Sequence, residues 1–126
     1  AEHQAYTCHD LQDPIRFYGG QNDIFLVAEK DGHVIGTVAI KEEKPDTALL
    51  RRIFVRQEYR GRGYGTKLLK AALKFCFDHN YHTVNFRVSS RMQQALRLCM
   101  QEGFQERGRI PGTDIKLYLL VKTLKA

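Results

Sequence analysis

The chain has 126 residues, of which 43% are hydrophobic and 27% are charged, proportions that suit one globular domain with a core of its own. No apolar run is as long as a membrane span and the start lacks the pattern of a signal peptide, so we expect a cytoplasmic protein with no membrane partner. The net charge of +6 is compatible with nucleic-acid binding. The basic residues are interleaved with acids, however, and no stripe of aromatic residues accompanies them, so no nucleic-acid partner is expected.

Residues 1–22 are polar and weakly patterned. The element expected there is a short helix at residues 13–18, with Pro14 in its first turn and Gly19-Gly20 ending it. We assign residues 1–126 to a single domain that begins with this segment.

Two strands joined by a tight turn are expected next, at residues 24–29 and 34–40. Asp31-Gly32 between two apolar runs is a strong hairpin signal. Gly36 inside the second strand predicts a bulge or a close backbone contact. Residues 41–46 form a charged loop in this interpretation, and a third strand follows at residues 48–55.

A helix is expected after the glycine-rich turn at residues 60–65, and Asn80 is its predicted stop. Its inward face combines spacings of three and four and consists of Leu68, Leu69, Ala72, Leu73 and Cys76. Residues 83–88 then alternate between apolar and polar, which indicates a strand. The order of strand, helix and strand favours a crossover between parallel neighbours.

Residues 90–93, Ser-Arg-Met-Gln, fit a capping box that begins a second helix. The helix is expected to end at Glu102, with Gly103 as the left-handed residue and Phe104 folded over the last turn. Its predicted inward residues are Met92, Ala95, Leu96, Cys99 and Met100. Strands at residues 104–110 and 115–123, joined by a turn, complete the chain.

The cysteine and histidine positions argue against a metal site. Cys8, Cys76 and Cys99 cannot all pair within one chain, and their spacing matches no zinc pattern. Two of them fall in helical runs, where a free cysteine usually behaves as a small buried hydrophobic residue. His79 and His82 have no further ligands beside them, so no metal is expected.

The glycine-rich turn separates the third strand from the first helix. Its glycines let a ligand approach the main chain, and the unpaired N–H groups and the macrodipole of the helix suit a phosphate. A P-loop is excluded because Gly65 is followed by Thr66 and only then by Lys67. The dinucleotide fingerprint is excluded because its third glycine position also holds Thr66. The simpler alternative is a turn with solvated arginines.

Arg60, Gly63 and Gly65 form the pattern Arg-x-x-Gly-x-Gly, which resembles the acyl-CoA signature of the GNAT superfamily of N-acetyltransferases. The element order matches that fold over residues 23–123. The resemblance implies an α/β fold: a mixed, mostly antiparallel sheet with a parallel pair at the coenzyme A cleft and helices on both faces. The usual first strand and helix lack a counterpart, so we expect a shortened N-terminus whose exposed strand edges favour a homodimer.

The resemblance also implies acetyl-CoA as the cosubstrate, a primary amine as the acceptor and no metal. The loop amides would hold the pyrophosphate and the preceding strand the pantetheine arm, with a backbone N–H near Phe54 or Val55 stabilising the oxyanion. Ile53 and Val55 equally suit the core of a central strand. The residues that the resemblance assigns to acetyl-CoA are Ile53, Phe54, Val55, Arg60, Gly61, Arg62, Gly63, Tyr64, Gly65 and Thr66.

The family's usual catalytic side chains are missing. Leu49 occupies the register of the base and cannot accept a proton, and Cys99 occupies the register of the acid. Glu43 or its neighbour Glu42 is the candidate base acting through water, with a solvated loop pair as the alternative. Cys99 is a candidate weak proton donor or else a buried hydrophobic residue, and Tyr118 is another candidate hydroxyl.

We therefore expect an N-acetyltransferase that moves an acetyl group from acetyl-CoA to a primary amine by direct attack in a ternary complex. The missing side chains leave a second hypothesis, a non-catalytic module that senses coenzyme A or binds a partner. Nucleic-acid binding through the basic stretch at residues 51–62 is a third, weaker hypothesis. The sequence leaves the acceptor open.

Overall fold

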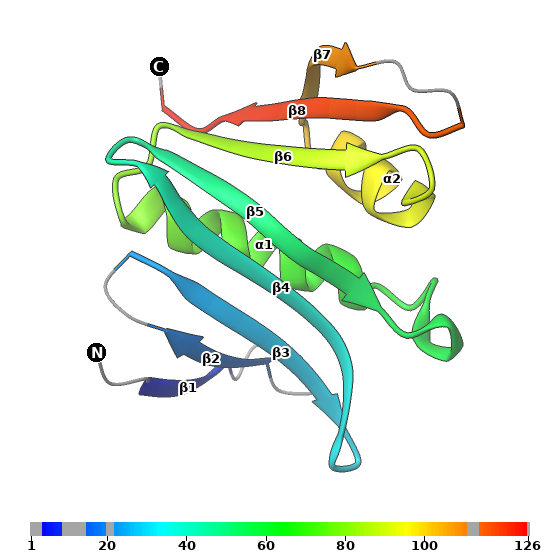
Figure 1. Cartoon of the computed structure of the whole chain (residues 1–126). Coiled ribbons are helices and arrows are strands. Elements are labelled where there is room, and N and C mark those ends of the chain that lie inside the picture. The colour runs from blue at the N-terminus through cyan, green and yellow to red at the C-terminus, as the bar shows by residue number, and fades with distance from the viewer. Residues whose placement is uncertain (1–3, 9–14, 20–21, 111–113, 126) are drawn as a thin grey trace.

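The computed structural model describes residues 4–8, 15–19, 22–110 and 114–125, with side chains described from Asn22 onward. In these residues one eight-stranded sheet carries two α-helices (Figure 1). The elements are β1 (Gln4–Cys8), β2 (Ile15–Gly19), β3 (Ile24–Lys30), β4 (His33–Lys44), β5 (Thr47–Val55), the 3-10 helix η1 (Gln57–Tyr59), α1 (Tyr64–Asp78), β6 (Thr83–Ser89), α2 (Gln93–Gln101), β7 (Gln105–Ile110) and β8 (Leu117–Thr123).

The strand order is β1-β2-β3-β4-β5-β6-β8-β7. Every neighbouring pair is antiparallel except β5 and β6, which are parallel, so the mixed sheet with one parallel pair is confirmed. Helix α1 packs on β3, β4 and β5, and α2 packs on β6 and on α1. Both helices share one core and lie on the same face of the sheet, whereas the sequence predicted helices on both faces. The opposite face is called the open face below.

The N-terminal segment differs from the prediction. Residues 15–19 form strand β2 instead of the end of a helix, while residues 13 and 14 lie outside the described residues. β2 pairs with β3, so that Tyr18 lies opposite Phe25, and β1 pairs with β2 in turn. Ile15, Phe17 and Tyr18 are of the β-branched and aromatic types that favour strands. This pairing covers the edge of β3 that the sequence analysis left exposed.

Strand β4 is longer than predicted, because it includes residues 41–44 that were assigned to a charged loop. Lys41 pairs with Leu49 and Glu42 with Ala48 of β5. The charged side chains are compatible with a strand here because this end of β4 is largely solvent-exposed. The turn between β3 and β4 is as predicted, with positive φ at both Asp31 and Gly32.

Gly36 satisfies both parts of its prediction. The register between β3 and β4 shifts beside it, since Ala28 pairs with Gly36 and Glu29 with Val34. A Cβ at this position would lie 2.8 Å from Leu68 Cδ1 and 3.1 Å from the carbonyl oxygen of Phe54. Gly36 therefore lets α1 lie close against β4.

We expect Gly36→Ala to lower the free energy of unfolding by about 1–3 kcal/mol, because the added methyl overpacks a buried contact with Leu68. Chemical denaturation measures the change. The same substitution in a Leu68→Ala background should cost less, since the clashing methyl group is then absent. Equal costs in the two backgrounds would contradict this explanation.

Helix α1 begins and ends as its sequence indicates. The predicted inward residues are all buried, namely Leu68, Leu69, Ala72, Leu73 and Cys76. At its end Asn80 has a φ of 64°, and its N–H donates to the Phe77 carbonyl while the N–H of Tyr81 donates to the Cys76 carbonyl. These two bonds are those of a Schellman motif.

Helix α2 starts later than the capping box implied. The Ser90 hydroxyl accepts a hydrogen bond from the N–H of Lys116 instead of capping the helix. The Gln93 side chain donates a hydrogen bond to the Ser90 carbonyl. Ala95 and Cys99 are buried as predicted, but Met92 and Met100 are exposed. α2 is amphipathic over nine residues only, so its narrower apolar stripe leaves the two methionines at the solvent side.

Candidate functional site

The main chain turns from the sheet into α1 through η1 and the glycine-rich loop. Gly63 is the N-cap of α1 with a φ of 87°, a left-handed conformation that disfavours residues with a Cβ. The first intrahelical bond runs from the Lys67 N–H to the Gly63 carbonyl. The N–H groups of the helix that precede Lys67 therefore have no hydrogen-bond acceptor within the helix. They point out of its N-terminal end, where the macrodipole adds positive potential.

A pocket of about 260 Å³ opens at this end of α1. Its walls come from the end of β5, from η1 and the glycine-rich loop, from the first turn of α1 and from one face of α2. The lining residues are Val55, Tyr59, Arg60, Gly61, Gly63, Tyr64, Gly65, Thr66, Gln94, Leu98 and Gln101. The structure thus brings together most of the residues assigned to acetyl-CoA from the sequence, and it adds three from α2.

Three of the assigned residues lie away from the pocket lining. Ile53 is buried in the core, Phe54 is 50% exposed on the open face, and Arg62 is an exposed residue within the loop. The Arg62 guanidinium lies 5.5 Å from the centre of the Tyr59 ring. Arg60 Nε donates to the Val55 carbonyl at 2.9 Å, which anchors this cation to the end of β5.

Gly65 has a packing role. A Cβ on this residue would lie 2.7 Å from Leu98 Cδ1, so an alanine here would force the Leu98 side chain to shift. This contact joins the two helices that wall the pocket. The sequence analysis explained Gly65 only by access of a ligand to the main chain.

β5 and β6 diverge after a short ladder. Their register pairs Thr47 with Thr83, Ala48 with Val84 and Leu49 with Asn85, and a hydrogen bond of 3.3 Å joins the two threonine hydroxyls. Beyond this point both strands continue, β5 to Val55 and β6 to Ser89, without pairing to each other. Backbone groups of β5 that face β6 are therefore available to a ligand between the strands.

A β-bulge in β5 accompanies the divergence. Arg51 pairs with Ala39 and Phe54 with Thr37, so two residues of β5 lie opposite one of β4. Arg52 within the bulge has a φ of 54°, and its carbonyl accepts the Thr37 hydroxyl at 2.7 Å. A positive φ costs a residue with a Cβ about 1–2 kcal/mol, and such strain concentrates at functional sites.

We expect Arg52→Gly to raise the free energy of unfolding by up to about 1 kcal/mol, because glycine adopts positive φ without this cost. The neighbouring Arg51→Gly is the matched control, since Arg51 has no positive φ and glycine there should destabilise by about 0.5–1 kcal/mol. Denaturant titration of both variants checks the difference. Equal destabilisation by both would show that the bulge stores no strain.

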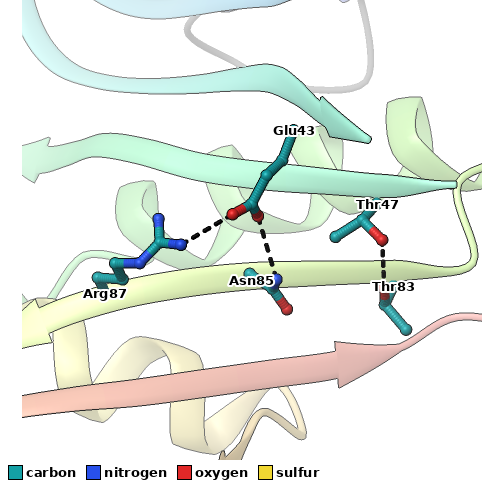
Figure 2. Close-up of polar contacts among 5 residues, drawn as sticks. All are labelled: Glu43, Thr47, Thr83, Asn85 and Arg87. Carbon is teal, nitrogen blue, oxygen red and sulfur yellow. Dashed lines mark hydrogen bonds and ion pairs between the residues drawn. The ribbon is translucent and has the colours of Figure 1, made fainter. Parts of the chain in front are cut away.

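Glu43 belongs to a polar cluster on the open face (Figure 2). Arg87 Nη2 donates to Glu43 Oε1 at 2.8 Å and Asn85 Nδ2 to Glu43 Oε2 at 3.1 Å. The hydrogen bond from Arg87 lowers the pKa of Glu43 most, and it outweighs the opposing effect of partial burial. The carboxylate is therefore ionised at neutral pH, but it is a weaker base than a free glutamate.

The candidate acids occupy the other face. Cys99 is fully buried and belongs to the core, and burial raises the pKa of its thiol to about 12. Tyr118 pairs with Val88 and packs against the same core, with the Arg109 guanidinium 5.0 Å from the centre of its ring. The structure therefore does not bring Glu43 together with Cys99 and Tyr118.

Within the described parts of the chain, no group of three or more His, Cys, Asp and Glu side chains is arranged to hold a metal ion. None of the described helices has the length and apolar character needed to cross a membrane. Cys76 is a buried free cysteine, as its helical pattern predicted.

A mixed sheet that divides at its one parallel pair, with a glycine-rich helix N-terminus beside the division, defines the fold class of the GNAT acetyltransferases. Residues 2–104 match the model of the Acetyltransferase (GNAT) family. The chain belongs to this family.

Two curated relatives illustrate the relationship. The chain is 30% identical to N-acetyltransferase 8F1 from Rattus norvegicus over 105 residues, which are 79% of this chain and 48% of the relative. It is 32% identical to N-acetylaspartate synthetase from Homo sapiens over 115 residues, which are 86% of this chain and 38% of the relative. The chain thus spans less than half the length of these two relatives.

Solved structures agree on the fold. A GNAT-family acetyltransferase from Streptococcus pneumoniae superposes with a TM-score of 0.72 at 25% identity, covering 84% of this chain and 70% of the other. The structure of yncA from Salmonella typhimurium with its cofactor acetyl-CoA gives a TM-score of 0.75 at 20% identity, covering 84% and 67%.

Proposed function

We propose that the protein transfers an acetyl group from acetyl-CoA to a primary amine by direct attack in a ternary complex. The observation that carries the proposal is the pocket at the start of α1, located beside the point where β5 and β6 diverge. Family membership and the names of the relatives, which are N-acetyltransferases, support the same reaction.

In this proposal the pyrophosphate of acetyl-CoA binds the first-turn amides of α1, with Arg60 beside it. Val55 and the α2 residues Gln94, Leu98 and Gln101 contact the rest of the cofactor along the pocket. The pantetheine arm enters between β5 and β6, where the side of β5 that faces β6 is not paired with that strand. Ile53 supports this backbone from the core.

The reaction forms one bond and breaks another. The amine nitrogen attacks the thioester carbonyl, a backbone N–H near Phe54 or Val55 stabilises the oxyanion, and the carbon–sulfur bond then breaks to release the thiolate of coenzyme A. The thiol has a reference pKa of about 8.5, so the thiolate leaves without strong acid assistance. An amine with a pKa of about 10.4 is neutral in only about one molecule in 2,500 at pH 7, so proton removal is the harder step.

The positions of the candidate side chains favour water, and not a buried side chain, as the group that takes the proton from the amine and protonates the thiolate. Cys99 is sealed in the core with a raised pKa, and Glu43 is held by Arg87 with a lowered pKa. Tyr118, which is half-buried, is the remaining hydroxyl of the predicted set. We infer that Cys99→Ala changes kcat by less than about threefold, which would assign Cys99 to packing alone.

Calorimetric titration with acetyl-CoA, followed by mass spectrometry of an amine panel, tests the proposed function. Saturable binding and an acetylated amine are expected. Binding without turnover of any amine would favour the non-catalytic module that senses coenzyme A. Absence of binding at millimolar acetyl-CoA would overturn both hypotheses. The cytoplasmic location stays a prediction. The homodimer also stays a prediction, and light scattering of the purified protein checks it.

A further inference from the structure

We propose that the acceptor amine carries a carboxylate, as in a small amino acid, and that Arg51 and Arg87 bind this carboxylate on the open face of the sheet. The inference rests on the proposed function, because it assumes that the thioester lies between β5 and β6. It deepens that function by naming the chemical class of the acceptor.

The two arginines lie at the start of the division between the strands. Leu49 and Asn85 are the last paired residues of β5 and β6, and side chains two residues further along a strand return to the same face. Arg51 and Arg87 are these residues, so they flank the opening on the open face. Each lies about 7 Å beyond the last pair along its strand.

The open face is the side from which the acceptor arrives. The pocket for the cofactor is built from α1 and α2 on the opposite face, so the bound cofactor blocks approach to the thioester from there. Arg51 precedes Phe54 by three residues, which span at most about 10 Å of chain. A long arginine side chain therefore holds the carboxylate of a small substrate while its amine reaches the thioester.

Arg87 is oriented for this role by Glu43 (Figure 2). The Glu43 carboxylate accepts a hydrogen bond of 2.8 Å from one guanidinium nitrogen of Arg87, Nη2. The Arg87 side chain remains 51% exposed. The other N–H groups of the planar guanidinium stay available for a second acceptor. A guanidinium binds a carboxylate with two parallel hydrogen bonds, which an ammonium group does not.

The charge of the open face favours an anion. Around the start of the division, the described residues place Lys41, Arg51 and Arg87 on this face by register together with the carboxylate of Glu43. Glu29, also on this face by register, lies further away on β3. Leu49 lies between these charges and is half-buried, so it provides an apolar surface beside them. An apolar surface lowers the local dielectric constant, so cations beside it interact more strongly with an anionic ligand than cations in open solvent do.

The test compares amines that differ only in the carboxylate, namely glycine against glycinamide and L-aspartate against its diamide. Because amidation lowers the pKa of the neighbouring amine, kcat/KM is calculated per deprotonated amine. We expect the carboxylate form to be preferred by at least about tenfold, the factor that a charged hydrogen bond provides. Preference for the amides, or equal values, would overturn the inference while leaving the acetyltransferase function intact.

Arg51→Gln and Arg87→Gln assign the effect to residues. Each is expected to raise KM for the carboxylate form by about ten- to a hundredfold, with KM for the amide and the affinity for acetyl-CoA unchanged. Arg107→Gln on β7, beyond β8, removes the same charge as the control and should leave all three values unchanged. An equal effect of all three variants would refute specific binding, and failure to acetylate any amine would overturn the function and this inference together.

Discussion

Gly63→Asp is expected to raise the dissociation constant of acetyl-CoA by at least about a hundredfold, because a carboxylate beside the pyrophosphate opposes binding by several kcal/mol. The position is well suited to the test. A Cβ on Gly63 meets no atom within 4 Å, so the side chain fits the free protein. The φ of 87° adds strain of about 1 kcal/mol or more to the fold.

Two matched variants separate strain from charge. Gly63→Ala imposes at least as much backbone strain without the carboxylate, and it should weaken binding far less than Gly63→Asp. Gly32→Asp places the same residue at a φ of 79° in the β3–β4 turn, where a Cβ also meets no atom, so acetyl-CoA should bind it normally. Titration calorimetry and denaturation measure both effects. Normal affinity in Gly63→Asp would exclude the loop as the phosphate site.

Local patterns predicted the elements that depend on a few neighbouring residues. The face of α1, the alternation of β6 and the glycine at the start of α1 follow from spacings of two to four residues, and all agree with the structure. The beginning of the chain was less accessible. β2 is short, and its strand form depends on pairing with β3, so the local signal of Pro14 and Gly19 pointed to a helix instead.

The bulge in β5 left a signal in the sequence that was missed. Leu50 and Ile53 are both buried although they are three residues apart, and strict alternation in a strand puts residues at that separation on opposite faces. The consecutive pair Arg51-Arg52 between them therefore indicates an extra residue. A bulge in a strand that ends at a candidate site is itself a functional hint.

The contribution of α2 to the pocket also has a sequence signal. Gln94, Leu98 and Gln101 recur at spacings of four and three, which places them on one helix face. Their position beside the glycine-rich loop was not predictable, because it depends on the contact of Gly65 with Leu98 across 33 residues of sequence, from 65 to 98. The bond between Glu43 and Arg87 is long-range in the same way.

Phe104→Ala is expected to lower the free energy of unfolding by about 3–5 kcal/mol, a large part of the stability of a domain of this size. Phe104 is 2% exposed, and its N–H donates to the Cys99 carbonyl at 3.0 Å in the turn that ends α2. Its side chain belongs to the buried core. Phe77→Ala is the matched control, because Phe77 is 51% exposed and the Lys125 ammonium lies 4.6 Å from the centre of its ring. A loss of less than about 1 kcal/mol is expected there.

The loss in Phe104→Ala should also depend on the ligand. Because α2 lines the pocket, loosening its end weakens acetyl-CoA binding, and saturating acetyl-CoA in turn stabilises the variant by mass action. Thermal denaturation should show a decrease of about 10 °C or more without ligand and a partial recovery with it. Recovery in Phe104→Ala but none in a Gly63→Asp/Phe104→Ala double variant would place the stabilising ligand at the glycine-rich loop. Equal recovery in both would place that ligand elsewhere on the protein.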